Sequence, residues 1–356
     1  MHILLNPGPV NVSPRVRAAL GGPDICHREP EYFDLQDAIR TRLPGVFGAP
    51  TADYTAVLLT GSGTAMVEAM IASGVPQGGR LLVVRNGVYG ERIARMAAAH
   101  GIACDGLAAP WVERPDPNAV DRALARTRYD ALAIVHHETT IGLLNDLGPL
   151  AAVAHARRVR LLVDAVSSLG GERFDFQSWA PDAVACTANK CVQGLPGLSF
   201  ALVRREFMET MRTYAERSVY FHLPRHHLEQ ERRSTPFTPA VQIAYALQAA
   251  LEELADETVA GRIARYGRAA AIVRDGLEAR GLHLLLPPKL RSNTLTAVKL
   301  PGISYVSLHD ALKREGFVIY AGQGALADVC FRVANMGHVE EADFRRFVDA
   351  IGACVA

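Results

Sequence analysis

Short apolar runs alternate with longer amphipathic stretches along most of the chain. The runs are continuous, without regular polar positions, which is typical of strands buried on both faces. On this pattern we predict strands at 56–60, 81–84, 102–104, 131–135, 161–163, 183–186 and 200–203. Helices are predicted from Thr64 onward, at 91–101 and at 147–157. This alternation indicates an α/β fold with a mainly parallel sheet covered by helices.

The pattern changes after about residue 245. We predict a long helical stretch at 243–277 and a final helix at 340–353, with short strands between them at 295–298, 318–320 and 330–333. These elements are typical of a smaller α+β domain. The expected organisation is an N-terminal arm at 1–20, a large domain at 21–245 and a small domain at 246–356.

Polar residues follow the predicted strands at their carboxyl ends, where ligands bind in parallel sheets. Asp164 closes the strand at 161–163, and Lys190 follows 26 positions later on the next loop. Pyridoxal 5'-phosphate (PLP) chemistry uses such a pair, a lysine that forms a Schiff base and a carboxylate that keeps the pyridine nitrogen protonated. A solvated loop lysine and an aspartate helix cap would explain the same two residues.

The segment 61–64, Gly-Ser-Gly-Thr, lies between a predicted strand and a predicted helix. Free N–H groups and the helix dipole favour an anion there, and Ser62 and Thr64 add hydroxyl donors. The segment is neither a Walker loop nor a full dinucleotide fingerprint. An ordinary turn with a threonine cap is the alternative.

Three further residues have side chains suited to a cofactor or substrate. Tyr89, on a glycine-flanked loop, could stack on an aromatic cofactor, and Thr139 could bind a cofactor oxygen. Arg332, on a predicted strand, could hold a carboxylate through two parallel hydrogen bonds. Simple packing, strand-end capping and a surface salt bridge are the respective structural alternatives.

Together these motifs resemble those of fold-type I, class V PLP-dependent aminotransferases, in that family's order and over nearly the whole chain. The shared motifs are 6–10, 62–64, 86–90, 138–142, 164–168, Lys190 and 238–239. The resemblance implies a large PLP-binding domain, a smaller C-terminal domain and a homodimer with shared active sites.

The resemblance also implies a role for each residue. Lys190 would form the Schiff base, Asp164 would pair with the pyridinium nitrogen, and Tyr89 would stack on the ring. Thr139 would contact the phenolic side of the cofactor, and Arg332 would bind the substrate carboxylate. The cofactor phosphate would be held by Ser62, Gly63 and Thr64, with Thr238 reaching in from the partner subunit.

Within the class, the runs 137–145, 188–197 and 316–320 are most similar to the branch that uses 2-aminoethylphosphonate and pyruvate. This implies amino transfer from 2-aminoethylphosphonate or a close analogue to pyruvate, giving phosphonoacetaldehyde and alanine. The segment 26–32 instead resembles the alanine–glyoxylate branch, and 217–233 departs from the phosphonate pattern. The candidates for holding the phosphonate are Arg332, Arg217 and Arg28.

Other functions remain open. An alanine–glyoxylate or serine–glyoxylate (or pyruvate) aminotransferase would use the same residues. A PLP-dependent lyase such as a desulfurase needs a nucleophilic cysteine on a mobile loop, whereas Cys330 immediately precedes the predicted strand that carries Arg332. A non-enzymatic binding protein of this fold would be expected to lack Lys190 or Asp164, and both are present.

Composition and charge narrow the partners. The 356 residues are 49% hydrophobic and 21% charged with a formal net charge of +1, so no overall field attracts nucleic acid or an anionic membrane. No apolar stretch approaches the roughly 20 residues of a membrane helix, and the N-terminus lacks the features of a signal peptide. We therefore expect a cytoplasmic enzyme without nucleic-acid or membrane partners.

The cysteines and histidines do not indicate a metal site. The six cysteines form no CxxC pair and are expected to be buried free thiols. The adjacent histidines at 136–137 and 226–227 would point to opposite faces of a strand, which makes poor chelates. We predict that the protein binds no metal.

Overall fold

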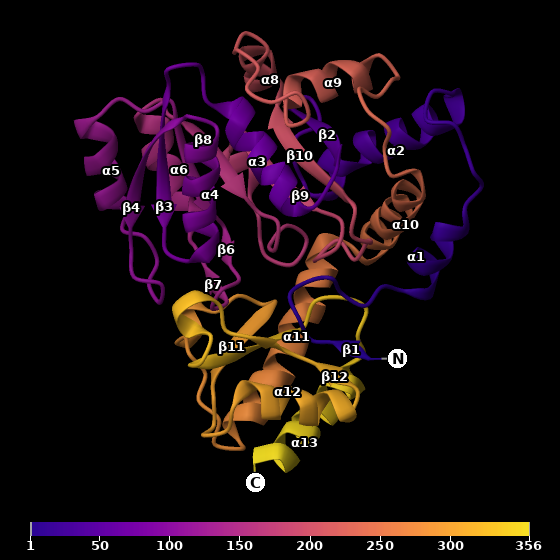
Figure 1. Cartoon of the computed structure of the whole chain (residues 1–356), viewed down its shortest axis with the longest axis vertical. Coiled ribbons are helices and arrows are strands. Elements are labelled where there is room, and N and C mark those ends of the chain that lie inside the picture. The colour runs from indigo at the N-terminus through magenta and orange to yellow at the C-terminus, as the bar shows by residue number, and fades with distance from the viewer. Residues whose placement is uncertain (1, 356) are drawn as a thin grey trace.

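The computed structural model describes residues 2–355, which form two domains stacked along the long axis of the molecule (Figure 1). The large domain contains a seven-stranded sheet with helices on both faces. The small domain contains the C-terminal part of the chain, and the N-terminus lies beside it (Figure 1).

The large sheet has the strand order β2-β10-β9-β8-β5-β3-β4. Its strands are β2 (Tyr54–Thr60), β3 (Arg80–Arg85), β4 (Ala103–Ala108), β5 (Ala131–Val135), β8 (Arg160–Asp164), β9 (Ala183–Thr187) and β10 (Leu198–Arg204). Only β10 is antiparallel to its neighbours, β2 and β9. The prediction of a mainly parallel sheet built from these segments is confirmed.

Successive residues of the central strands face two separate cores. Leu82, Leu132 and Val163 lie in one core, and the residues directly before them lie in the other. The first core is covered by α2 (Pro30–Val46), α5 (Pro117–Arg126), α6 (Leu147–Ala156), α7 (Phe176–Trp179) and α10 (Val241–Glu257). The second is covered by α3 (Gly63–Gly74), α4 (Val88–Ala99), α8 (Arg205–Met211) and α9 (Leu223–Glu231). Burial on both faces explains why the strands are continuously apolar.

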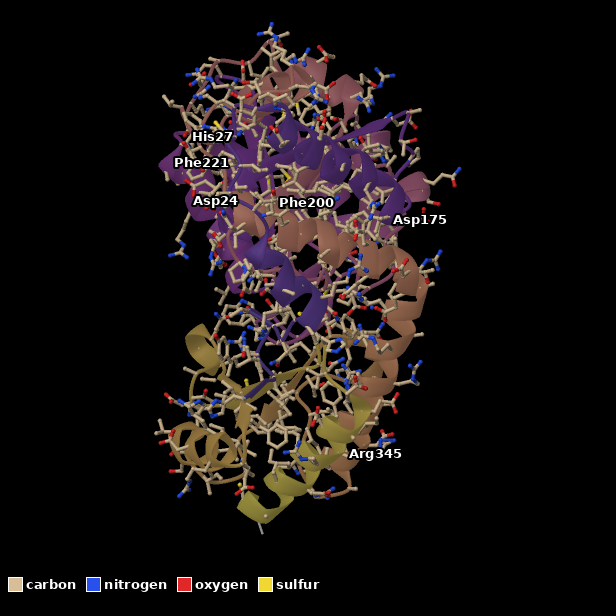
Figure 2. All side chains as sticks on the ribbon, turned by 90° about the vertical axis from the view of Figure 1, so that its right-hand side faces the viewer. Asp24, His27, Asp175, Phe200, Phe221 and Arg345 are labelled. Atoms are coloured by element: carbon tan, nitrogen blue, oxygen red, sulfur yellow. The ribbon has the colours of Figure 1, made fainter. Side chains whose placement is uncertain are left out.

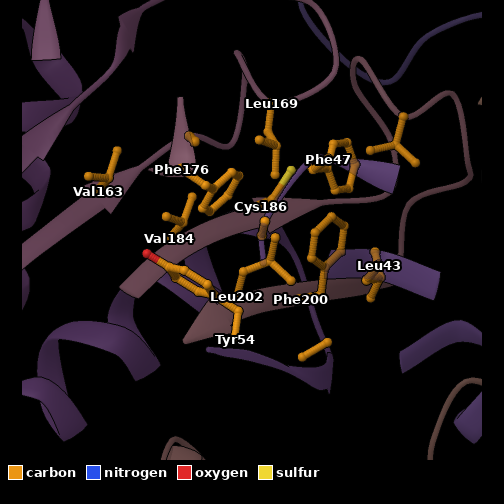
Figure 3. Packing of buried hydrophobic residues seen from close by; sticks show 14 of the residues in the cluster. Leu43, Phe47, Tyr54, Val163, Leu169, Phe176, Val184, Cys186, Phe200 and Leu202 are labelled. Atoms are coloured by element: carbon orange, nitrogen blue, oxygen red, sulfur yellow. The ribbon is translucent and has the colours of Figure 1, made fainter. Parts of the chain in front are cut away.

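Aromatic rings fill the first core beside the antiparallel strand. The rings of Phe47 and Phe200 stack with their centroids 5.9 Å apart (Figure 3). Tyr54 meets Phe176 edge to face at 5.2 Å, and its hydroxyl donates to the carbonyl oxygen of Pro181. These contacts pack the sheet against the helices of the first core.

The small domain is built on the antiparallel sheet β11-β14-β13. Its elements are α11 (Val259–Glu278), β11 (Leu295–Lys299), α12 (Tyr305–Arg314), β12 (Phe317–Val318), β13 (Tyr320–Ala321), β14 (Cys330–Ala334) and α13 (Glu341–Val355). The N-terminal strand β1 (Ile3–Leu4) pairs in parallel with β12, and Leu5 lies in the core of this domain. A hairpin of β6 (His137–Glu138) and β7 (Leu143–Leu144) extends from the large domain.

The helical stretch predicted at 243–277 is two helices, because the chain turns at Thr258, where φ is +66°. Helix α10 packs against α2, with Leu247 and Leu251 in the large-domain core. The expected boundary between residues 245 and 246 therefore falls inside α10. The expected arm is also divided, since β1 joins the small domain and α1 (Pro14–Ala18) packs on α10.

Within the described residues, no helix is both long enough and apolar enough to cross a membrane. Among the same residues, no cluster of three or more histidine, cysteine, aspartate or glutamate side chains is placed to hold a metal ion.

Candidate active site

A cavity of about 220 Å³ lies where the carboxyl ends of the large-domain strands face the small domain. Both domains and the N-terminal segment, through Pro7 and Gly8, contribute to its lining. Seven of the residues selected from the sequence line it: Ser62, Gly63, Thr64, Tyr89, Asp164, Lys190 and Arg332. The tertiary structure therefore brings together side chains that are up to 270 positions apart in the sequence (from Ser62 to Arg332).

Asp164 is the last residue of β8, and its side chain is buried. Its Oδ1 accepts the N–H of Val166 at 3.0 Å. Burial raises the pKa of Asp164, while the Val166 N–H and the charges of Lys190 and Arg92 oppose that rise. A cationic N–H donor placed against this carboxylate would favour its ionised form.

Lys190 lies on the loop that follows β9, and Nζ is 5.7 Å from the centroid of the Tyr89 ring. The N-terminal segment packs against its side chain at Gly8, where φ is +122°. A Cβ atom at Gly8 would lie 3.2 Å from Cγ of Lys190. Glycine therefore allows both the backbone conformation and the close approach to the lysine.

Ser62 caps α3, and its Oγ accepts the N–H of Ala65 at 3.4 Å. The free N–H groups of the first helical turn and the positive end of the helix dipole lie at the cavity wall. Nη1 of Arg92 donates to Oγ1 of Thr64 at 3.3 Å. This end of α3 is suited to bind a phosphate.

Glu138 of β6 holds the start of α4 in place. Its carboxylate accepts the N–H groups of Tyr89 and Thr140, each at 3.2 Å, and the Thr140 hydroxyl. Burial raises the pKa of Glu138 to about 7. A Cβ atom at Gly87 would lie 2.1 Å from Cδ of Glu138. The carboxylate thus occupies the space beside Gly87 and positions Tyr89 at the cavity.

Thr139 is buried next to the cavity but is not part of its lining. Its carbonyl oxygen accepts from Nη1 of Arg332 at 3.0 Å. Its hydroxyl oxygen is buried without a hydrogen-bond partner among the described residues. Such a hydroxyl in a native protein usually meets a ligand or a water molecule.

Arg332 lies on β14 and is only 3% exposed. Besides its bond to Thr139, Nη1 donates to Oε1 of Gln323 at 3.1 Å, and Nε donates to the carbonyl oxygen of Ala321 at 2.8 Å. Among the described residues these bonds engage Nε and Nη1 and leave Nη2 for a ligand. A guanidinium that is held in place with one free amino group is suited to a carboxylate or a related anion.

Three selected residues lie elsewhere in the subunit. Arg217 donates to the carbonyl oxygens of Ala72, Val75 and Pro76, beside the C-terminal end of α3. Helix α3 begins at the cavity, has 12 residues and is about 18 Å long. Arg217 lies at its other end, so its proposed role in binding substrate is wrong for the cavity of its own subunit. Its guanidinium instead holds the chain that leaves α3.

Arg28 is exposed on the loop that precedes α2 and does not line the cavity of its own subunit. His27, its neighbour, lies at the outer side of the large domain (Figure 2). Thr238 is exposed too, and it borders a second small pocket together with Thr60 and Tyr220. Within one subunit, neither residue reaches the cavity.

Sequence reasoning did not select Arg92, Gly8, Gln323 or Glu138. Arg92 follows Tyr89 by three positions on α4, which places both side chains on one face. The sequence pattern predicts this helix only from residue 91 and puts Tyr89 on a loop, so it does not reveal that spacing. Gly8 and Gln323 reach the cavity only because separate parts of the chain fold together.

All six cysteines are free, but only Cys186, Cys191 and Cys330 are buried, and Cys26 is exposed. Burial raises the pKa of Cys330, and its Sγ donates to the carbonyl oxygen of Leu326. A raised pKa leaves little thiolate at neutral pH, so Cys330 lacks the activation that a nucleophilic cysteine requires.

The residues around the cavity fit PLP group by group. The N-terminus of α3 can take its phosphate, and the buried Asp164 carboxylate can accept a pyridinium N–H. The unpaired hydroxyl of Thr139 can donate to the phenolic oxygen, and the amine of Lys190 is placed for a covalent bond to the aldehyde carbon. Together these side chains satisfy the polar groups of the cofactor.

Comparison with known proteins identifies the family. The family model described as aminotransferase class-V matches residues 23–346. A 2-aminoethylphosphonate–pyruvate transaminase of Syntrophobacter fumaroxidans is 37% identical, covering 98% of this chain and 95% of its own length. One from Vibrio vulnificus is also 37% identical, covering 98% and 96%.

Solved structures agree with this assignment. An alanine–glyoxylate aminotransferase from Nostoc is 27% identical with a TM-score of 0.95, covering all of this chain and 95% of its own. A pyridoxamine–pyruvate aminotransferase from Mesorhizobium loti is 26% identical with a TM-score of 0.91, covering 99% and 91%. A cysteine desulfurase from Thermococcus onnurineus, at 14% identity and a TM-score of 0.80, shares the fold alone. The chain therefore belongs to the class V aminotransferases, and it is a PLP-dependent transaminase of fold type I.

Proposed function

We propose that this transaminase moves the amino group of 2-aminoethylphosphonate, or a close analogue, to pyruvate and so forms phosphonoacetaldehyde and alanine. Relatives with that activity in their names are 34–37% identical over nearly the whole chain. The structural observation that supports the proposal is the Nη2 group of Arg332, which has no partner among the described residues and belongs to the cavity that holds Lys190. That group can bind the acid group of either substrate in the cavity that also contains the lysine.

When bound, PLP supplies a ring that withdraws electrons from the substrate carbon bearing the nitrogen. We assign the movement of the proton of that carbon to Nζ of Lys190, the amine in the cavity. With PLP bound, Asp164 would accept the pyridinium N–H and so keep the ring nitrogen protonated. Tyr89 would pack on the ring face and exclude water from it.

Arg332 is proposed to bind the anionic group of each substrate in turn. Pyruvate and alanine present a carboxylate, and the phosphonate presents three acceptor oxygens with between one and two negative charges, as a phosphate does. Nη2 of Arg332 can donate to either group through a charge-assisted hydrogen bond. Gln323 and Tyr320 border the same part of the cavity and can add polar contacts.

We further propose a cytoplasmic homodimer in which Thr238 of each subunit completes the phosphate site of the other. The exposure of Thr238 in a single subunit supports this proposal, since an interface would cover it. Thr238 is followed by Pro239, as in the family motif.

A half-reaction assay tests the donor. The purified PLP-loaded enzyme is mixed with one donor and no acceptor, and the loss of cofactor absorbance follows amino transfer. We expect rapid loss with 2-aminoethylphosphonate, and recovery on addition of pyruvate. Brisk turnover of alanine or serine with glyoxylate, and none with the phosphonate, would instead assign the chain to the alanine–glyoxylate activity. The Nostoc neighbour favours that as the second candidate.

A further inference from the structure

Arg92 brings a positive charge into the cavity that none of the roles above uses. It lies on α4, and Cζ of its guanidinium is 4.7 Å from the centroid of the Tyr89 ring. Nη1 donates to Oγ1 of Thr64, the second residue of α3. The guanidinium therefore contacts two parts of the expected cofactor site. One is the Tyr89 ring, which is expected to stack on the cofactor, and the other is the start of α3, which is expected to bind the phosphate.

The charges around the cavity are unbalanced. Its lining contains the cations Lys190, Arg92 and Arg332 but only one carboxylate, Asp164. Within residues 2–355, the bond to Thr64 is the one hydrogen bond of the Arg92 side chain, and no carboxylate forms an ion pair with it. Its remaining N–H donors are available to an anion that enters the cavity.

We propose that Arg92 binds the phosphate of the cofactor and closes the site formed by Ser62, Gly63 and Thr64. A phosphate monoester carries about 1.5–2 negative charges at pH 7 and three acceptor oxygens. The end of α3 supplies only about half a positive charge. Arg92 adds a full charge and can present two parallel N–H donors to the phosphate oxygens.

The contact with Tyr89 prepares Arg92 for this role. A guanidinium stacked on an aromatic face is partly ordered before the ligand arrives, so less side-chain entropy is lost on binding. Lys190 cannot take over the balancing charge, because its amine is used in the covalent bond to the cofactor. Arg332 belongs to the small domain and is held by Thr139 and Gln323.

Binding of PLP to the apoenzyme tests the proposal without any amino donor. Replacement of Arg92 by methionine (Arg92→Met) should raise the Kd for PLP about 10- to 150-fold, the equivalent of about 1.5–3 kcal/mol for a hydrogen bond to a charged group. Pyridoxal lacks the phosphate, so its Kd should differ by no more than about twofold between Arg92→Met and wild type. Arg92→Lys, which keeps the charge, should recover part of the loss for PLP.

Arg95→Met is the matched control, because Arg95 is exposed on the same helix; it should change neither Kd. Inorganic phosphate should promote pyridoxal binding to wild type but not to Arg92→Met. If Arg92→Met weakens PLP and pyridoxal equally, Arg92 acts through Tyr89 and the proposal fails. The proposal also fails if Arg92→Met changes neither the Kd for PLP nor the Kd for pyridoxal. That holds even if the variant has a higher KM for 2-aminoethylphosphonate, because Arg92 would then act on the substrate and not on the cofactor. Because the titration uses no donor, these outcomes are separate from those of the donor assay.

Discussion

At the scale of single residues, several ionisable side chains at or near the cavity are buried. The pKa of each depends on the polar groups nearest to it. Asp164, Glu138 and Glu172 are all buried, and burial raises the pKa of each. Hydrogen bonds from backbone N–H groups partly offset that rise. Asp164 differs from the other two because it lines the cavity, where a ligand can supply the missing positive partner.

The Lys190→Ala protein should fold normally but hold no covalently bound PLP. Nζ of Lys190 is the amine that the cavity places beside Asp164 and Tyr89. Borohydride reduction followed by peptide mapping checks this, with the label expected on Lys190 in wild type and absent from the variant. Lys289→Ala is the control and should keep the label. Labelling of Lys289 or Lys299 in wild type would falsify the assignment.

Stability should fall as pH rises from 7 to 8 because of Glu172. Its carboxyl group is buried between Asn293 N, which donates to it at 2.6 Å, and the Thr294 hydroxyl. Burial raises the pKa of Glu172 from 4.5 to about 8. Between pH 4.5 and 8 the folded state therefore binds more protons than the unfolded state. The free energy of unfolding consequently falls as pH rises toward 8, by up to about 1.4 kcal/mol per pH unit.

Urea denaturation of Glu172→Gln at several pH values measures this effect. The slope of the free energy of unfolding between pH 7 and 8 should be shallower than in wild type. Glu138 contributes mainly below pH 7, since its pKa is about 7. Glu113→Gln, at an exposed position, should leave the slope as it is. A slope that is the same in Glu172→Gln and wild type would contradict the prediction.

At the scale of elements, the cavity depends on how strand ends and helix starts are joined. The short strand β6 ends at Glu138, with Thr139 directly after it, and the Glu138 carboxylate bonds to the first turn of α4. Tyr89 and Arg92 both lie on α4. A change in the contact between β6 and α4 is therefore expected to move the two α4 side chains that face the cofactor site.

Gly87→Ala should disturb this junction. The new Cβ atom would lie 2.1 Å from Cδ of Glu138, so the carboxylate or α4 must shift. We expect a loss of stability on the order of 1–3 kcal/mol, as for other overpacked sites, together with weaker PLP binding. Denaturation and PLP titration of the same sample measure both effects. Gly21→Ala, which meets nothing within 4 Å, is the control, and an equal response of the two variants would refute the explanation.

At the scale of the whole molecule, the cavity needs both domains. The large domain contributes Asp164 and Lys190, the small domain contributes Arg332, and the N-terminal segment contributes Gly8. The pairing of β1 with β12 ties that segment to the small domain. A movement of the small domain would therefore carry Arg332 and Gly8 together relative to Lys190.

The proposed sharing of sites between subunits predicts complementation. Lys190→Ala and Thr238→Ala homodimers should each be impaired at limiting PLP. After unfolding, mixing and refolding, a hybrid dimer has one site with both Lys190 and Thr238 intact. Random pairing would restore about a quarter of the wild-type sites, since half the dimers are hybrids with one intact site each. Absence of any recovery, or a fully active monomer in light scattering, would rule out the shared site.

The sequence by itself determined the sheet, its mainly parallel direction and most of the site. Continuous apolar runs must be buried on both faces, and polar residues at their ends therefore converge on one edge of the sheet. For that reason Asp164, Lys190 and the start of α3 were predictable from local pattern. The similarity of the motifs to class V aminotransferases, carried by residues such as Thr139 and Lys190, added PLP and the type of reaction.

Only the tertiary structure decided which charged side chains reach the cavity. Sequence reasoning selected Arg217 and Arg28 but not Arg92, yet Arg217 holds carbonyl oxygens beyond the far end of α3 and Arg28 lies on an exposed loop. The domain boundary likewise depended on α10 packing against α2 before the chain turns at Thr258. The physical reason is that a long side chain or an amphipathic helix has several possible partners, and contacts between distant segments select one of them.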